Sequence, residues 1–258
     1  MKIHVLGSLS GTEPFKNRQH TAWVLELDNG HLYWFDAGEN CSHTGYLKGL
    51  DFFNIKAIFI SHPHYDHMAG LLNIFSVYSK MHYIEQDTTT WRDFDVFMPV
   101  PELWEPFESL TRTLAAWPPV TEVRNHLLTD GGKFENDEIK IEFRGNCHIK
   151  TQPGEPLKSF SFRISAGGKT VVYSGDIADP DEIGDWSKAC DVLLMESGHH
   201  HPWDVCKYWR ENSCNIGQVI FMHHGRDVLY MPTESKIRCR RALGKEVIFA
   251  QDGMTFDL

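Results

Sequence analysis

Three histidines and one aspartate fall within six consecutive positions of this chain, in the sequence SHPHYDH at residues 61–67. Neutral imidazoles combined with a carboxylate are the donors that zinc and the neighbouring divalent metals take in proteins. A regular helix or strand cannot aim His62, His64, Asp66 and His67 at one point, whereas a loop at the end of a strand can. The alternative is a polar loop whose histidines share no role. The types and spacing of these residues predict a divalent metal site.

The elements expected around this run would place it on such a loop. Residues 57–60 (AIFI) are a short continuous apolar run, typical of a buried strand, and residues 68–78 have apolar spacing compatible with a helix. Further strands are expected at residues 2–6, 22–27, 31–35, 81–84, 139–144, 159–164, 170–173, 192–195, 218–222 and 246–249, and further helices at 104–116, 203–212 and 233–243. A strand-rich first half and an alternating second half fit two sheets packed face to face with helices outside.

The pattern His62-x-His64-x-Asp66-His67 resembles the signature of the metallo-β-lactamase superfamily. The chain is similar to that family in five further places, in the family's order. They are FDAG at residues 35–38, His148 after the expected strand at 139–144, SGD at 174–176, His223 after the expected strand at 218–222, and FAQDG at 249–253. The resemblance covers essentially the whole chain apart from residues 86–126. It implies a single domain over residues 1–258 of the α/β (α+β) class, with the four-layer αββα sandwich of this family.

The resemblance also implies a ligand set for two divalent ions. His62, His64 and His148 would hold one ion, Asp66, His67 and His223 would hold the other, and Asp176 would bridge them. Asp176 follows an apolar strand, where a buried carboxylate without a cation is costly. The family pattern selects His223 over the adjacent His224, and it gives Asp36 the role of orienting a ligand histidine. Zn²⁺ is the default ion, and Mn²⁺ or Fe²⁺ suits the same donors.

The chemistry that follows from such a pair of ions is hydrolysis. Two divalent ions about 3.5–4 Å apart can share a hydroxide that forms near neutral pH. In the reaction that the resemblance implies, Asp66 holds this hydroxide in line for attack, while the ions stabilise the charge that builds on the substrate oxygens. We therefore expect a metal-dependent hydrolase of an ester-like bond.

Two segments are similar to the ribonuclease Z and cyclic-phosphodiesterase branch of the family. One is GSLSGTEP at residues 7–14, and the other is DVLLMESG at residues 191–198, where Glu196 alone matches the branch's His-Glu-Ala-Thr tetrad. In ribonuclease Z this glutamate partners a histidine that opens the following helix and protonates the leaving oxygen. The resemblance thus implies catalytic roles for Glu196 and His201, with His200 as the alternative acid. A general acid of this kind is worth about 10²–10⁴-fold in rate.

The charge of the chain favours a small phosphodiester as the substrate. Its 25 Lys+Arg against 35 Asp+Glu give a net charge of −10, so we expect no long nucleic acid as a partner. A carboxyl-ester-type hydrolase of a lactone or thioester, using the same two ions, is the alternative. A tRNA 3′-processing endonuclease and a non-catalytic metal-binding protein are the remaining interpretations.

Residues 86–126 interrupt the resemblance and are rich in proline and aromatic side chains. We expect short helices and loops laid across a surface, either as a packed insertion or as a substrate lid or a contact between two copies in a homodimer. No apolar run approaches the roughly 20 residues of a membrane span, so we expect no contact with a membrane. Six cysteines without a CxxC spacing indicate reduced thiols in a cytoplasmic protein.

Overall fold

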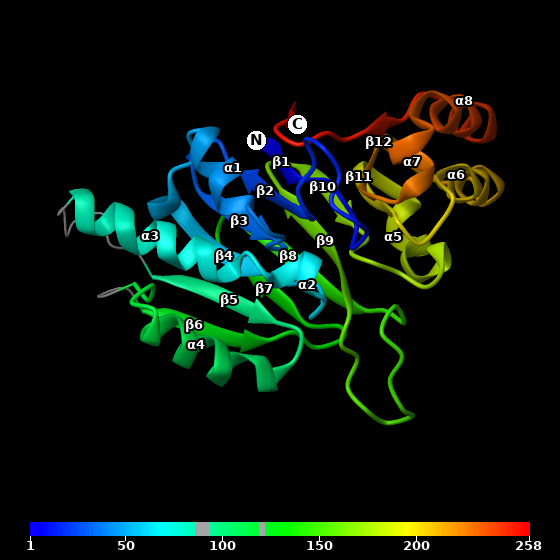
Figure 1. Ribbon diagram of the computed structural model, residues 1–258. Helices are drawn as coiled ribbons and strands as arrows, with labels where there is room; N and C mark the ends of the chain where they lie inside the picture. Colours follow the sequence, from blue (N-terminus) through cyan, green and yellow to red (C-terminus); the bar gives the residue numbers. More distant parts are fainter. Residues whose placement is uncertain (86–92, 119–121) are drawn as a thin grey trace. The chain divides into compact units, whose positions relative to one another are not determined.

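The computed structural model describes residues 1–85, 93–118 and 122–258. The chain forms two compact units: unit 1 comprises residues 1–7, 14–128 and 252–258, and unit 2 comprises residues 8–13 and 129–251. Within the described residues each unit holds one seven-stranded sheet (Figure 1). None of the helices in these residues has the length and apolar character that crossing a membrane requires. The single domain, the cytoplasmic location and the homodimer stay predictions.

The sheet of unit 1 has the strand order β14-β1-β2-β3-β4-β5-β6. Its strands are β1 (Lys2–Gly7), β2 (Ala22–Glu26), β3 (Leu32–Phe35), β4 (Ile55–Phe59), β5 (Phe94–Met98), β6 (Val123–Leu127) and β14 (Thr255–Asp257). Strands β14 to β3 pair antiparallel, and strands β3 to β6 pair parallel. Continuous apolar runs such as LYWF in β3 are buried along their whole length, as strands covered on both faces require.

The helices of unit 1 are α1 (Cys41–Leu47), α2 (Tyr65–Met68), α3 (Leu71–Glu85) and α4 (Trp104–Thr113), with short 3₁₀ turns η1 (Phe52–Asn54) and η3 (Pro101–Leu103). The two expected helices are present with shifted bounds, as α3 and α4, whereas α1 and α2 are two helices that were not expected. The strand predicted at residues 81–84 is wrong, because α3 continues through Glu85. His82 is buried about one helical turn after the buried Tyr78, whereas Tyr83 and Ile84 are exposed. This alternation of buried and exposed side chains has the 3.6-residue period of a helix.

The segment 86–126 contributes to the sheet as well as to the surface. Residues 94–98 and 123–127 form the paired strands β5 and β6, so this part of the chain is not only short helices and loops. The apolar side chains of β5 that face α3 are fully buried, among them Phe94, whose ring lies 5.4 Å from that of Phe75. The expected helix is present as α4. Residues 86–92 and 119–121 of this segment lie outside the described part of the chain.

The sheet of unit 2 has the strand order β13-β12-β11-β10-β9-β8-β7. Its strands are β7 (Lys133–Glu135), β8 (Ile139–Gly145), β9 (Phe160–Ala166), β10 (Lys169–Tyr173), β11 (Ala189–Ser197), β12 (Asn215–His224) and β13 (Ile248–Phe249). Its helices are α5 (Gly184–Ser187), α6 (Pro202–Glu211), α7 (Arg226–Tyr230) and α8 (Pro232–Leu243), with a 3₁₀ turn η4 (Pro180–Ile183). Strands β10 to β13 run parallel, so their carboxyl ends meet at one edge of the sheet.

Each unit contains a segment from near the N-terminus that pairs with a distant part of the chain. In unit 1, β14 pairs antiparallel with β1, and the Leu258 N–H donates to the Met1 carbonyl at 3.0 Å. In unit 2, Leu9 forms a β-bridge with His224, and the Ser10 hydroxyl donates to the His224 carbonyl at 2.8 Å. The loop at residues 8–13 is thereby fixed to the end of β12, where one of the predicted metal ligands lies.

Candidate metal centre

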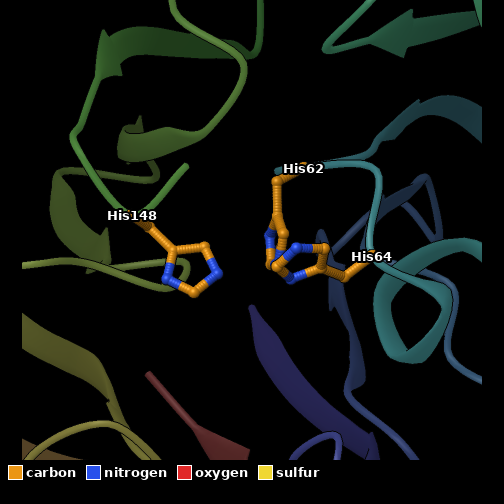
Figure 2. A group of neighbouring side chains, drawn as sticks. All are labelled: His62, His64 and His148. Carbon is orange, nitrogen blue, oxygen red and sulfur yellow. The ribbon is translucent and has the colours of Figure 1, made fainter. Parts of the chain in front are cut away.

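The histidine run of unit 1 lies on the loop between β4 and α2, as the sequence predicts. His62 and His67 are fully buried and Asp66 is nearly so, while His64 is the residue that precedes the first turn of α2. The His62 Nε2 lies 3.1 Å from the His64 Nδ1, and the two rings meet edge to face (Figure 2). The His67 Nε2 lies 3.5 Å from the Asp66 Oδ2. The rings of His62 and His67 lie 4.0 Å apart between centroids, so the two pairs form one group of four donor side chains.

Asp36 fixes the orientation of His67. Its carboxylate accepts hydrogen bonds from the Ser61 N–H at 2.7 Å, the Ser61 hydroxyl at 2.9 Å and the His67 Nδ1 at 2.9 Å, and all three residues are fully buried. Because carboxylate oxygens only accept, the Nδ1 of His67 carries the proton, and its Nε2 keeps the lone pair that can bind a cation. Asp36 has φ +55°, a left-handed conformation that Asp tolerates better than most residues. The structure thus brings Asp36 into contact with His67, while its role in orienting a metal ligand stays a prediction.

Asp176 is the centre of the second set of donors, which belongs to unit 2. It follows β10 after Gly175, which has φ +56°, and its carboxylate is 1% exposed. Three imidazole nitrogens surround its Oδ2: His223 Nε2 at 3.3 Å, His148 Nε2 at 3.6 Å and His199 Nδ1 at 3.7 Å. A carboxylate buried among three imidazoles is a set of oxygen and nitrogen donors that fits a divalent ion.

His148 lies on the loop that follows β8, shown in Figure 2, and neighbouring polar groups hold this loop in place. The His148 N–H donates to the Asn146 side-chain oxygen at 3.2 Å. The Glu182 carboxylate accepts from the Cys147 N–H at 2.7 Å and from the Ala178 N–H at 2.9 Å. Glu182 therefore ties the loop of His148 to the loop that follows Asp176, a role that no motif in the sequence indicated.

The adjacent residues His223 and His224 have different surroundings. Both ring nitrogens of His224 are engaged within the fold, since Nδ1 lies 2.9 Å from the Ser197 hydroxyl and Nε2 lies 2.8 Å from the Ala250 carbonyl. His223, with φ +50°, turns its Nε2 toward Asp176 instead. A non-glycine residue in this backbone conformation stores strain of about 1–3 kcal/mol, which is common at functional sites.

Glu196 lies at the end of β11, fully buried, and it contacts His199 and His200, the second of which is the alternative acid. Its Oε2 accepts from the backbone N–H groups of Gly198 at 2.8 Å and His199 at 2.9 Å. Its Oε1 lies 3.3 Å from the His199 Nδ1 and 3.5 Å from the His200 Nε2. The expected pairing of Glu196 with His201 is therefore not the one that the structure has.

His201 instead pairs with a carboxylate on the neighbouring helix. It directly precedes α6, its Nδ1 contacts the Asp227 Oδ2, and its ring stacks on Trp203 with centroids 4.9 Å apart. This contact with Asp227 holds the ring against α7. The side chain of His201 is 59% exposed. Its predicted role as an acid stays a prediction.

The sequence and the fold both match known proteins. The family model described as "Beta-lactamase superfamily domain" matches residues 35–224. A ribonuclease Z of Prochlorococcus marinus (strain NATL2A) is 40% identical over 281 residues, an alignment that covers 86% of this chain and 87% of that protein.

Solved structures agree in fold at lower sequence identity. The metallo-β-lactamase fold protein YhfI from Bacillus subtilis has a TM-score of 0.74 and 17% identity, with 99% of each chain covered. A diphosphatase from the PhnP family has a TM-score of 0.70 and 18% identity, with 100% of this chain and 97% of that chain covered. These structural matches confirm the predicted metallo-β-lactamase fold.

Proposed function

Because the chain belongs to the β-lactamase superfamily, in the branch that contains ribonuclease Z, we propose that this metal-dependent hydrolase cleaves phosphodiester bonds. The family bears out the predicted class of enzyme. The proposal concerns the bond that is cleaved, the ions and the residues that act on the substrate.

Two divalent ions, Zn²⁺ in the first place, complete the proposed centre. Seven side chains would hold them: His62, His64, Asp66, His67, His148, Asp176 and His223. Imidazole nitrogens and carboxylate oxygens without a thiolate suit Zn²⁺, Mn²⁺ and Fe²⁺ alike. When bound, such ions polarise phosphoryl oxygens and lower the pKa of water toward neutrality.

The observation that carries this proposal is the environment of Asp176. Its carboxylate is buried, and the nitrogens of His148, His199 and His223 lie within 3.7 Å of one oxygen. Burying a carboxylate costs several kcal/mol unless a positive charge compensates it. Neutral imidazoles supply no such charge, whereas a divalent cation held by the same atoms does.

The remaining polar groups have roles that follow from their contacts. The carboxylate of Asp66 is almost fully buried beside His67. It would accept a proton from the attacking water and hold the resulting hydroxide in line with the phosphorus. Glu196, fixed by two backbone N–H groups, would keep neighbouring imidazoles oriented. His201, exposed and held by Asp227, is the proposed donor of the proton to the leaving oxygen.

Two substrate classes fit a phosphodiesterase of this branch. The net charge of −10 favours a small phosphodiester, which carries one or two charges rather than a long phosphate backbone. The match to a ribonuclease Z favours the 3′ end of an RNA as the second candidate, and the expected exclusion of a long nucleic acid is not supported by that relative.

A parallel activity screen tests the proposal. The protein, loaded in turn with Zn²⁺, Mn²⁺ and Fe²⁺, is assayed on bis-nitrophenyl phosphate, cyclic nucleotides, a tRNA precursor with a 3′ extension, lactones and thioesters. We expect turnover of phosphodiesters and none of the carbonyl substrates. Turnover confined to a lactone or thioester would overturn the proposal, and cleavage of the precursor alone would select the second candidate.

A further inference from the structure

We propose that His199 is an additional metal ligand of this chain, next to Asp176. This inference rests on the proposed metal centre and goes beyond the ligand set that the family pattern implies, which does not contain His199. It follows from the geometry of unit 2, where the His199 Nδ1 lies 3.7 Å from the Asp176 Oδ2.

The distances around Asp176 are within about 0.1 Å of those expected for donors that share an ion. Donor atoms about 2.0–2.2 Å from a tetrahedral zinc lie roughly 3.3–3.6 Å from one another. The three nitrogens of His223, His148 and His199 lie at 3.3, 3.6 and 3.7 Å from the Asp176 Oδ2. The donor atoms of His148, Asp176 and His199 all lie within 4.8 Å of one another. His199 is therefore as close to this carboxylate as His148, a predicted ligand.

The ring of His199 also lies among the rings of the predicted ligands. It stacks on His223 with an interplanar angle of 19° and centroids 5.3 Å apart, and it meets His148 edge to face at 4.6 Å. The three rings pack against one another, and each of them directs a nitrogen toward the same carboxylate oxygen of Asp176. The side chain of His199 is 42% exposed, so it lies at the rim of this cluster with its Nδ1 turned toward Asp176.

The backbone before His199 is built to bring the ring to this position. Glu196 accepts the N–H groups of residues 198 and 199, which fixes the turn that leaves β11. Gly198 passes so close to His223 that a Cβ there would lie 2.7 Å from the His223 Nδ1 and 3.0 Å from the Ser10 Cβ. Only glycine allows this approach, and the next residue then projects toward Asp176.

The neighbouring histidines lack this combination of contacts. The Nε2 of His200 donates to the Ile177 carbonyl at 3.0 Å, and His201 contacts Asp227 on α7. Of the three consecutive histidines at 199–201, His199 is thus the one whose ring nitrogen faces both Asp176 and Glu196. This contrast supplies a matched control for the experiment.

The test uses cobalt(II) in place of zinc and reads the spectrum of the bound ion. In the variant His199→Cys a bound thiolate would add a thiolate-to-cobalt charge-transfer band in the near ultraviolet, because thiolates are soft ligands of such ions. The control His201→Cys places the same thiol two residues further along, on an exposed side chain. Wild-type protein gives the baseline for the six native cysteines.

We expect the new band in His199→Cys alone. In addition, His199→Ala should weaken zinc binding, measured by competition with a chromophoric chelator, by more than the roughly 10–100-fold that follows loss of a group that only orients a ligand. Cobalt bound to His199→Cys without the band, or zinc affinity of His199→Ala within about threefold of wild type, would overturn the inference. Wild-type protein that binds neither ion would instead refute the proposed centre as a whole.

Discussion

Replacing Asp36 by asparagine should separate the metal affinity of the protein from its stability. Asp36→Asn keeps the shape of the side chain and tolerates the left-handed backbone at φ +55°. The amide oxygen can still accept from the Ser61 N–H. The amide NH₂ then faces the Ser61 hydroxyl and the His67 Nδ1, which lie 2.9 Å from the present carboxylate oxygen.

The magnitude follows from the tautomer of His67. Without an ion, the ring can accept the amide N–H at Nδ1 and carry its own proton on Nε2, so the loss in unfolding free energy should be only about 1–2 kcal/mol. When Nε2 binds an ion, the ring proton of His67 must return to Nδ1. The Nδ1–H and the N–H of the amide introduced at position 36 are then two donors that face each other with no acceptor between them. Two buried donors that face each other cost about 1.5–3 kcal/mol, so the affinity of the variant for zinc should fall by roughly 10–150-fold.

Two measurements on the same preparation check this expectation. Urea unfolding of chelator-treated protein gives the stability change, and chelator competition gives the change in zinc affinity. The control Asp51→Asn changes a carboxylate of the same unit that accepts the Phe53 N–H and the Asn54 side-chain amide, each at 3.0 Å. It should lower stability and leave zinc affinity within about threefold. Unchanged zinc affinity in Asp36→Asn would refute the assignment of the Nδ1 proton to the Asp36 contact.

Three further outcomes are expected. Asp66→Asn should keep the fold, seen by circular dichroism, and lose hydrolysis by at least about 10²-fold, because the nucleophile loses its base; wild-type turnover would exclude that role. Gly198→Ala should weaken zinc binding at least tenfold, because its Cβ would lie 2.7 Å from the His223 Nδ1, and unchanged affinity would mean that the loop moves freely. Zinc at 100 times its Kd should raise the unfolding free energy by about 2.7 kcal/mol over the chelated protein, and the absence of such a shift would show that no ion binds the folded state.

The convergence of the proposed metal ligands near β4 could be predicted from the sequence because local rules decide the position of these side chains. A buried apolar strand fixes the start of the loop that follows it, so closely spaced histidines on that loop must lie near one another at the end of the strand. The same holds for Asp176 and His223, which follow parallel strands whose carboxyl ends meet at one edge. In each case the hydrophobic pattern of the sequence reveals the strand, and the strand positions the proposed ligand that follows it.

The choice among the histidines at 199–201 could not be made in the same way. Their loop is held by the backbone contacts of Glu196, and the direction of each ring depends on Asp227 and on the close approach at Gly198. These are contacts between distant parts of the chain, and no local pattern encodes them. Strands β5 and β6 could not be predicted for a related reason. Each is a short run beside several prolines, and its extended conformation depends on pairing with neighbouring strands of the sheet.

The pairing of β1 with β14 bears on how the polypeptide is synthesised. Lys2, Ile3 and His4 lie opposite Asp257, Phe256 and Thr255, so this side of β1 stays open until residues 255–257 have left the ribosome. An open strand edge offers its N–H and C=O groups to any other strand, including one from a second nascent chain. Translation that halted before residue 252 would leave this edge permanently uncovered, and we expect such fragments to be recovered as aggregates rather than as a smaller, working catalyst.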